Sequence, residues 1–275
     1  MMAALARVLS GTLSGFYRAE GFFLAAGISF YVIICVVPLA FLLVAAAGFL
    51  LTDERAVEDV VAQLTEHLPV YRVELEEVLL QVVRARRVTG LLGTGIFLLF
   101  ASQLFAALRL VLNRILGIPK GRGFLHGVAF DLWMLLLITL LFFLSMAVTA
   151  VFAWMKAFLL FLRQAETLGA VLEWAELGLV VVLDTPMFCL LYRYVPARRP
   201  PWRFVLISGF LTAVLWELAK QLFRWYILSL GVYSEIYGSL GVLVALFMWI
   251  YYSAVVFVLG AALIRALEAA RGEPA

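Results

Sequence analysis

Long apolar stretches recur along this chain and constrain its fold more than any other feature. Each is at least about 20 residues long, the length that an α-helix needs to cross a bilayer. The stretches are continuous rather than alternating, which favours membrane helices over a barrel of strands. They predict six transmembrane spans, at about residues 22–51, 90–112, 128–152, 168–192, 204–229 and 238–263. We therefore expect residues 1–275 to form a single, all-α integral membrane domain.

The composition agrees with this class. Of the 275 residues, 65% are hydrophobic and 14% are charged, whereas soluble domains are about half apolar and a quarter charged. The net charge of +3 is too small, and the basic residues too scattered, to predict a nucleic-acid partner. Cys35 and Cys189 each fall inside a predicted span, so we interpret them as small buried hydrophobes and expect no disulfide. The N-terminal segment lacks a cleavage pattern, so the first span is expected to be permanent.

The distribution of Lys and Arg predicts the orientation of the spans, because cytoplasmic connections are enriched in both. Basic residues gather in the turns after the second and fourth spans and in both terminal segments: Arg114, Lys120, Arg122, Arg193, Arg198, Arg199, Arg203, Arg7, Arg18, Arg265 and Arg271. Both termini are therefore expected to be cytoplasmic. Arg84, Arg86 and Arg87 argue against this orientation, because they precede the second span on the opposite side.

Two regions outside the spans have helical periodicity. Leu5, Val8, Leu9, Phe16 and Tyr17 recur at helical spacing before the first span, which predicts an amphipathic helix on the inner membrane surface or an extension of the first span. Two further apolar stripes lie within residues 52–89 and predict two amphipathic helices over the outer face. The charged residues of this connection indicate either a solvated face or a lid over an outward opening.

The fifth predicted span carries charges in its interior, within "VLWELAKQLFRWYI". Since each helical residue advances about 100°, Glu217, Lys220, Gln221 and Arg224 fall on one narrow face. A lone charge at mid-membrane costs about 2.5–3.5 kcal/mol on insertion scales. Glu217 and Lys220 can pair at the i, i+3 spacing, whereas Arg224 needs another partner. This face must therefore point into the bundle.

The fourth predicted span can supply carboxylates to that face. Glu173 and Glu176 lie in its outer part, and Asp184 lies near its middle. One interpretation is a structural network of ion pairs that sets the register of the helices. The other is a functional cavity or polar pathway for an anionic headgroup or a solute, since ionisable residues inside a membrane often mark function.

Weaker candidates lie elsewhere in the spans. Arg109 and Asn113 end the second span on the inner side, Asp131 begins the third span there, and Arg193 follows the fourth. Arg109 either pairs with Asp131 or extends into the headgroups. The sequence "DTP", with Asp184 followed closely by Pro186, indicates either a broken helix of the kind that transporters use or a simple kink.

Five segments carry a resemblance that covers nearly the whole chain: "AAGISFYVIICVVPLAFLL", "ALRLVLNRILG", "LLYRYVPARRPPWR", "VLWELAKQLFRWYI" and "YSEIYGSLGVLVALFMWIYYSAVVFVLGAAL". In this order they resemble the YihY/BrkB family of bacterial inner-membrane proteins. The resemblance implies six membrane helices in a bacterial inner membrane, and members are described as virulence-associated or transport proteins with a link to envelope lipids. The polar positions of the family correspond here to Arg109, Asn113, Asp184, Arg193, Trp216, Glu217, Lys220, Tyr237 and Gly238.

Members of this family often carry the label "ribonuclease BN", which the residues do not favour. Cleavage of RNA by metal ions needs clustered carboxylates or histidines that face water. His67 and His126 are isolated and fall on opposite sides of the membrane in the predicted topology. The sequence also lacks the phosphate-binding loop of a nucleotide-driven pump. We expect neither an enzyme nor a cofactor.

Two hypotheses for the function remain. The first is a transporter or flippase-like protein, not driven by ATP, for an amphipathic and anionic envelope component such as a lipid. The second is a membrane scaffold that binds lipids or partners without moving them. Both predict membrane lipids as partners, anionic headgroups among them, and the sequence leaves open whether the chain forms a homo-oligomer.

Overall fold

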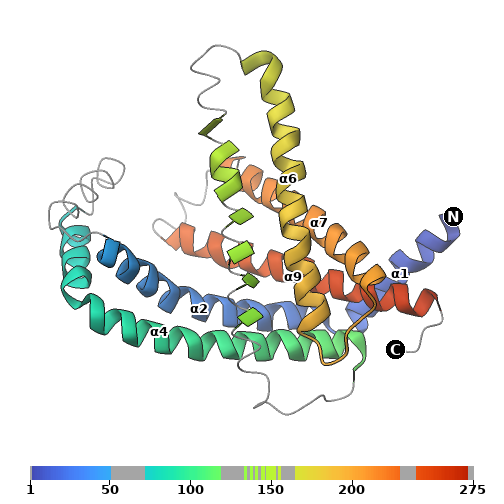
Figure 1. Ribbon diagram of the computed structural model, residues 1–275. Coiled ribbons are helices and arrows are strands. Elements are labelled where there is room, and N and C mark those ends of the chain that lie inside the picture. Colours follow the sequence, from blue (N-terminus) through green and yellow to red (C-terminus); the bar gives the residue numbers. More distant parts are fainter. Residues whose placement is uncertain are drawn as a thin grey trace. The chain divides into compact units, whose positions relative to one another are not determined.

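The computed structural model describes the backbone of residues 2–50, 72–118, 165–229 and 240–271, with parts of residues 133–155. Side chains are described for residues 6–39, 92–118, 174–226 and 244–271 and for part of 133–155. The helices are, in chain order, α1 (Met2–Arg18), α2 (Gly21–Leu50), α4 (Arg72–Leu116), α6 (Ala165–Tyr194), α7 (Trp202–Ser229) and α9 (Leu240–Ala270) (Figure 1). The predicted all-α fold is confirmed, and the described residues contain no strand.

Five helices are long and apolar enough to cross a membrane. The stretches are Gly21–Leu39, Leu92–Leu116, Trp174–Tyr194, Trp202–Tyr226 and Val244–Ala270, and they overlap five of the six predicted spans. The described residues of the remaining predicted span, 128–152, are helical. Too few of them are described to test that span, so the number six stays a prediction.

Residues 72–89 differ from the prediction in one respect. They are helical, but they do not form a separate amphipathic helix, because α4 continues from them through the whole second span. The stretch contains no proline, and the glycines at its centre weaken a helix without ending it. The other amphipathic helix expected in this connection falls on residues outside the described part of the chain.

The chain divides into two compact units. One unit comprises Tyr31–Leu104, with the later part of α2 and the earlier part of α4. The other comprises Met1–Phe30 and Phe105–Ala275. It holds α1, the beginning of α2, the end of α4, and α6, α7 and α9. The expectation of a single domain remains a prediction.

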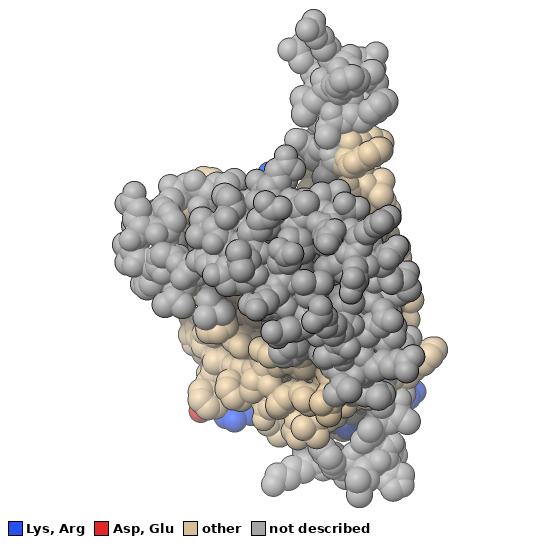
Figure 2. All heavy atoms as spheres, turned by 90° about the vertical axis from the view of Figure 1, so that its left-hand side faces the viewer, with Lys and Arg blue, Asp and Glu red and all other residues tan. Residues whose placement is uncertain are grey.

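In the larger unit, α6 packs against α7, α7 packs against α9, and α1 packs against α9 (Figure 1). The exposed side of α7 is apolar: Phe210, Leu218 and Leu222 are 51%, 53% and 57% exposed. Its buried side instead carries small and polar residues, with Ser208 and Thr212 fully buried. This distribution reverses that of a soluble protein and is typical of helices that associate inside a bilayer. The described surface drawn in Figure 2 is likewise mostly uncharged.

Two glycines allow α6, α7 and α9 to approach closely. A Cβ atom on Gly209 would lie 2.5 Å from the Cys189 sulfur, and one on Gly260 would lie 2.1 Å from the hydroxyl oxygens of Thr212 and Tyr192. Both distances are far shorter than van der Waals contact. The absence of a side chain at these positions therefore sets the spacing of the three helices.

A sharp corner joins α1 to α2. Glu20 adopts a φ of 58°, which ends the first helix before Gly21 begins the second. Phe16 is buried over this corner, where its ring occupies the space that a side chain on Gly21 would need. Residues 2–18 are therefore a helix of their own rather than an extension of the first span, and the place of this helix on the inner membrane surface stays a prediction.

Candidate functional site in the membrane bundle

Lys220 on α7 contacts two carboxylates at once. Its ammonium forms an ion pair with Glu217 one turn earlier, and its nitrogen lies 3.6 Å from a carboxylate oxygen of Asp184 on α6. Asp184 is 1% exposed, Glu217 is 7% exposed, and the Lys220 side chain is 32% exposed. The two carboxylates are thus held inside the bundle by the same cation, which reaches them from the side of a cavity.

Aromatic side chains hold Lys220 in place. Its ammonium lies 4.7 Å from the centre of the Trp216 ring, within the range of a cation–π interaction. The Trp216 indole donates a hydrogen bond to the Ser253 hydroxyl on α9 at 3.0 Å and stacks on Trp249, also on α9. The position of Lys220 is therefore determined by all three packed helices.

The exposed part of Lys220 faces a cavity of about 530 Å³. Its lining comes mainly from the first half of α6 and the second half of α7: Thr149, Trp174, Glu176, Leu177, Val180, Glu217, Lys220, Gln221 and Arg224. Four of these side chains are ionisable, in a region whose surroundings are apolar. The volume lies within the range of small-ligand pockets.

A second groove, on the opposite side of α7, is chemically different. It measures about 410 Å³ and lies between α7 and α9, where Leu222, Phe223, Tyr226 and Val255 are among its lining residues. No charged side chain is among the described residues that line it. The charges of α7 are thus concentrated on the side facing α6.

Beyond Asp184, toward the turn that joins α6 to α7, the bundle is tightly packed. The buried Tyr192 hydroxyl lies 3.1 Å from the Thr212 hydroxyl and donates a hydrogen bond to the Phe257 carbonyl at 2.8 Å. Ser208 donates a hydrogen bond to the Gly260 carbonyl. These hydrogen bonds hold α6, α7 and α9 in contact on the side of Asp184 that faces away from the cavity.

Pro186 leaves α6 continuous. The helix runs from Ala165 to Tyr194 with the proline inside it, so the sequence "DTP" does not break it. Thr185, next to the proline, donates a hydroxyl hydrogen bond to the Val181 carbonyl one turn earlier at 2.7 Å. Of the two interpretations of this sequence, the broken helix is wrong.

The polar residues expected at the inner end form hydrogen bonds with the segment that connects α6 to α7. Arg109 donates a hydrogen bond to the Val195 carbonyl at 3.3 Å, and the Asn113 side chain accepts one from the Ala197 amide at 2.9 Å. Arg193 bonds to the Pro200 carbonyl, and its guanidinium lies 5.3 Å from the centre of the Trp202 ring. The proposed partner of Arg109, Asp131, lies outside the described residues.

Comparison with known proteins places the chain in a family. The model of the family "Virulence factor BrkB" matches residues 12–275. The chain belongs to the BrkB family. Within that family it is 30% identical, over 203 residues, to a UPF0761 membrane protein of Idiomarina loihiensis, covering 73% of this chain and 69% of that protein.

Other BrkB-family relatives match over smaller shares of their length. A UPF0761 membrane protein of Alkalilimnicola ehrlichii is 32% identical over 183 residues, which is 66% of this chain and 40% of that protein. The UPF0761 membrane protein YihY of Salmonella typhimurium is 33% identical over 172 residues, 62% of this chain and 55% of that protein. These alignments thus span about half of each relative. No solved structure matches the chain. The family and the apolar helices together identify a multi-pass membrane protein.

Most residues of this candidate site could be predicted from the sequence. Of the predicted residues, Glu176, Glu217, Lys220, Gln221 and Arg224 line the cavity, and Asp184 lies behind Lys220. The side chain of Glu173, together with Tyr237 and Gly238, lies outside the described part of the structure.

The prediction missed four residues of the cavity wall: Trp174, Leu177, Val180 and Thr149. The first three had a detectable signal, because they recur with Asp184 at helical spacing on one side of α6. Thr149 had none, because nothing in the sequence relates its span to the other two.

Proposed function

We propose that this BrkB-family protein is a transporter or flippase-like protein, not driven by ATP, for an amphipathic and anionic envelope component such as a lipid. The observation that carries the proposal is the ionisable cavity between α6 and α7, placed within helices that are apolar enough to span a membrane. A static helix contact would need no such space. The proposal involves no covalent step, so it assigns no catalytic residue and requires no cofactor.

An anionic headgroup has two cations to bind in the cavity, Arg224 and Lys220. Arg224 is exposed, and Lys220 lies about one helical turn further in. Leu218 and Trp225 flank this face of α7 and are 53% and 66% exposed. The headgroup of an amphipathic ligand can therefore sit in the cavity while its acyl chains remain against the apolar side of α7, as a flippase-like mechanism requires.

The charges around Lys220 support movement of the ligand rather than permanent binding. Two carboxylates and one ammonium give the group a formal charge of −1, and uncompensated charge inside a membrane is costly. A headgroup that takes Lys220 away from Asp184 and Glu217 leaves both carboxylates without their cation. We propose that the two carboxylates, Asp184 and Glu217, take up a proton or a small cation when the ligand binds, and that this uptake supplies the driving force.

The proposed orientation places the termini in the cytoplasm. α1 packs on the C-terminal part of α9, and Arg198 in the α6–α7 turn pairs with Glu268 near the end of α9, so both termini and this turn lie at one end of the larger unit. That end is rich in arginine, which favours the cytoplasmic side of a bacterial inner membrane. The cavity then lies in the outer half of the bundle.

A scaffold is the competing function, and one observation favours it. The Glu217–Lys220 pair and its contact with Asp184 already satisfy much of the buried charge without a ligand. In that case the cavity would serve no transport, and the ion pairs would only hold α6 against α7.

Reconstitution into liposomes distinguishes these functions. Fluorescent phosphatidylglycerol is followed between leaflets in liposomes that contain wild-type protein, Arg224→Gln or Arg199→Gln. Arg199 is a matched control, because it is an exposed arginine outside the cavity. The proposal predicts faster movement than in empty liposomes, slowed by Arg224→Gln and unchanged by Arg199→Gln. Movement no faster than in empty liposomes would contradict it and favour the scaffold.

A further inference from the structure

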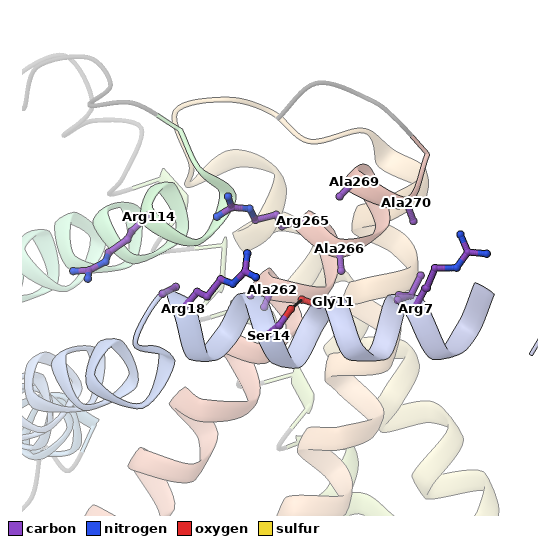
Figure 3. Close-up of a pocket in the computed structure, with 13 residues that line it drawn as sticks. Arg7, Gly11, Ser14, Arg18, Arg114, Ala262, Arg265, Ala266, Ala269 and Ala270 are labelled. Carbon is purple, nitrogen blue, oxygen red and sulfur yellow. Dashed lines mark hydrogen bonds between the residues drawn. The ribbon is translucent and has the colours of Figure 1, made fainter. Parts of the chain in front are cut away.

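A groove rich in arginine lies between α1 and the C-terminal part of α9, separate from the cavity described above. It has a volume of about 710 Å³ and is lined by four arginines: Arg7 and Arg18 on α1, Arg114 at the end of α4, and Arg265 on α9. Figure 3 shows that Arg7, Arg18 and Arg265 extend to the same side of α1. Two segments that are distant in the sequence, α1 and the C-terminal part of α9, thus direct cations to one surface.

Most of this positive charge is not balanced within the groove. No acidic side chain is among the described residues that line it. Arg114 pairs with Glu20 at 3.4 Å, but both side chains are about half exposed or more, so the pair is weak. Arg265 donates a hydrogen bond to the Ile115 carbonyl at 2.9 Å, which orients its guanidinium without neutralising it. The groove therefore favours an anion.

Small residues leave space beneath the arginines. α1 and α9 lie close together at Gly11, where a Cβ atom would be at van der Waals distance, 3.5 Å, from the Cβ of Ala266. One turn later a Cβ on Gly15 would meet nothing within 4 Å, so open space lies beside α1 there. Ser14, also on this side, is exposed. The groove therefore has both the charge and the room for a phosphate-bearing group.

The other side of α1 indicates that the phosphate belongs to a lipid. Leu9, Leu13 and Tyr17 recur at four-residue spacing and are 55%, 54% and 64% exposed. On a helix the centre of this apolar stripe lies about 130° around from Arg7 and Arg18, so the stripe and the cations face different sides. A helix with such an apolar side lies at the membrane surface, with its apolar residues among the acyl chains and its cations at the level of the phosphates.

We propose that the groove between α1 and α9 binds the phosphate of an anionic lipid headgroup, with Arg18 and Arg265 as its principal contacts. Guanidinium groups match phosphate geometry through paired hydrogen bonds. A bound headgroup would link α1, the end of α4 and the end of α9. This site is independent of the transport proposal, because a lipid can occupy the groove whether or not the cavity between α6 and α7 moves anything.

Native mass spectrometry of the detergent-purified protein can count the lipids that remain bound. Phosphatidylglycerol is titrated against wild type, against Arg18→Gln combined with Arg265→Gln, and against Arg199→Gln. We expect about tenfold weaker binding in the double variant, because two charge-assisted contacts are lost, and unchanged binding in the Arg199→Gln control. Equal binding by the double variant and wild type would overturn the proposal.

A second variant tests the site without removing charge. Gly15→Leu fills the open part of the groove, keeps all four arginines and favours the helix. It should weaken phosphatidylglycerol binding while the protein keeps its thermal stability, whereas full binding by a stable Gly15→Leu protein would count against the groove as the site.

Competition with inorganic phosphate identifies the source of the anion. A lipid site predicts that millimolar phosphate leaves bound phosphatidylglycerol in place, since the apolar side of α1 contributes to binding. Displacement of the lipid by millimolar phosphate would overturn the assignment to a lipid and indicate a site for free phosphate.

Discussion

The Lys220 nitrogen lies 3.6 Å from an Asp184 carboxylate oxygen, across the interface between α6 and α7. The same ammonium pairs with Glu217. Removal of the cation should therefore affect the protein more than removal of either carboxylate, because it leaves two buried acids without a counter-charge. This asymmetry does not depend on what the cavity binds.

We expect Lys220→Met to destabilise the protein by about 3 kcal/mol, the lower end of the cost of breaking a buried ion pair, because the lysine is partly exposed. Asp184→Asn should cost about 1 kcal/mol, since Glu217 still pairs with Lys220. Reversible unfolding in mixed micelles measures both variants. Equal losses would show that Lys220 does not serve the two carboxylates together.

A second buried ion pair joins the α6–α7 turn to the end of α9. Arg198 lies 2.7 Å from a carboxylate oxygen of Glu268, which is 2% exposed. Arg198→Ala should destabilise the protein by about 3 kcal/mol, because it leaves this buried carboxylate without a counter-charge. Adding Glu268→Gln should recover part of the loss, and the thermal unfolding temperatures of the single and double variants measure it. A double variant less stable than Arg198→Ala would contradict this explanation.

The close approach of α7 and α9 depends on Gly260. We expect Gly260→Ala to destabilise the bundle by about 1–3 kcal/mol, because the new methyl group overlaps the Thr212 and Tyr192 hydroxyls. Gly178→Ala is the matched control, since a Cβ on Gly178 meets nothing within 4 Å. It should be neutral or more stable by up to about 1 kcal/mol. Thermal unfolding in detergent compares the two, and a tolerated Gly260→Ala would contradict the packing.

The proposed orientation can be tested in cells. A reporter that is active only in the periplasm, fused after Ala270, should give no activity, because the arginine-rich end is expected to face the cytoplasm. A cytoplasmic reporter at the same position is the control and should be active. Strong periplasmic activity would reverse the topology and place the cavity between α6 and α7 in the inner half of the membrane.

The spans and the charged face of α7 could be predicted because both follow from local patterns. Apolar length identified five of the helices, and the helical repeat placed Glu217, Lys220 and Arg224 on one side. Local patterns do not identify helix ends as well. α9 was expected to end near residue 263, but it continues to Ala270, where Glu268 is buried against Arg198 rather than exposed to solvent.

Contacts between distant segments could not be predicted in the same way. Nothing in the sequence relates Arg18 to Arg265, because their meeting depends on the corner at Glu20 and on the packing of α1 against α9. The hydrogen bond from Trp216 to Ser253 likewise depends on the close packing of α7 and α9. Such relationships require the tertiary structure.

Glu217 provides the most direct test of whether the cavity is functional. Glu217→Gln keeps the shape of the side chain and removes its charge, and the exchanged pair Glu217→Lys with Lys220→Glu restores the ion pair with its direction reversed. Movement of fluorescent phosphatidylglycerol in liposomes is measured for both variants, alongside their thermal stability. Our account predicts that both fold, that both lose transport, and that the exchange does not restore it, because a ligand meets each charge at a given depth. Full transport by a stably folded Glu217→Gln protein would contradict the account.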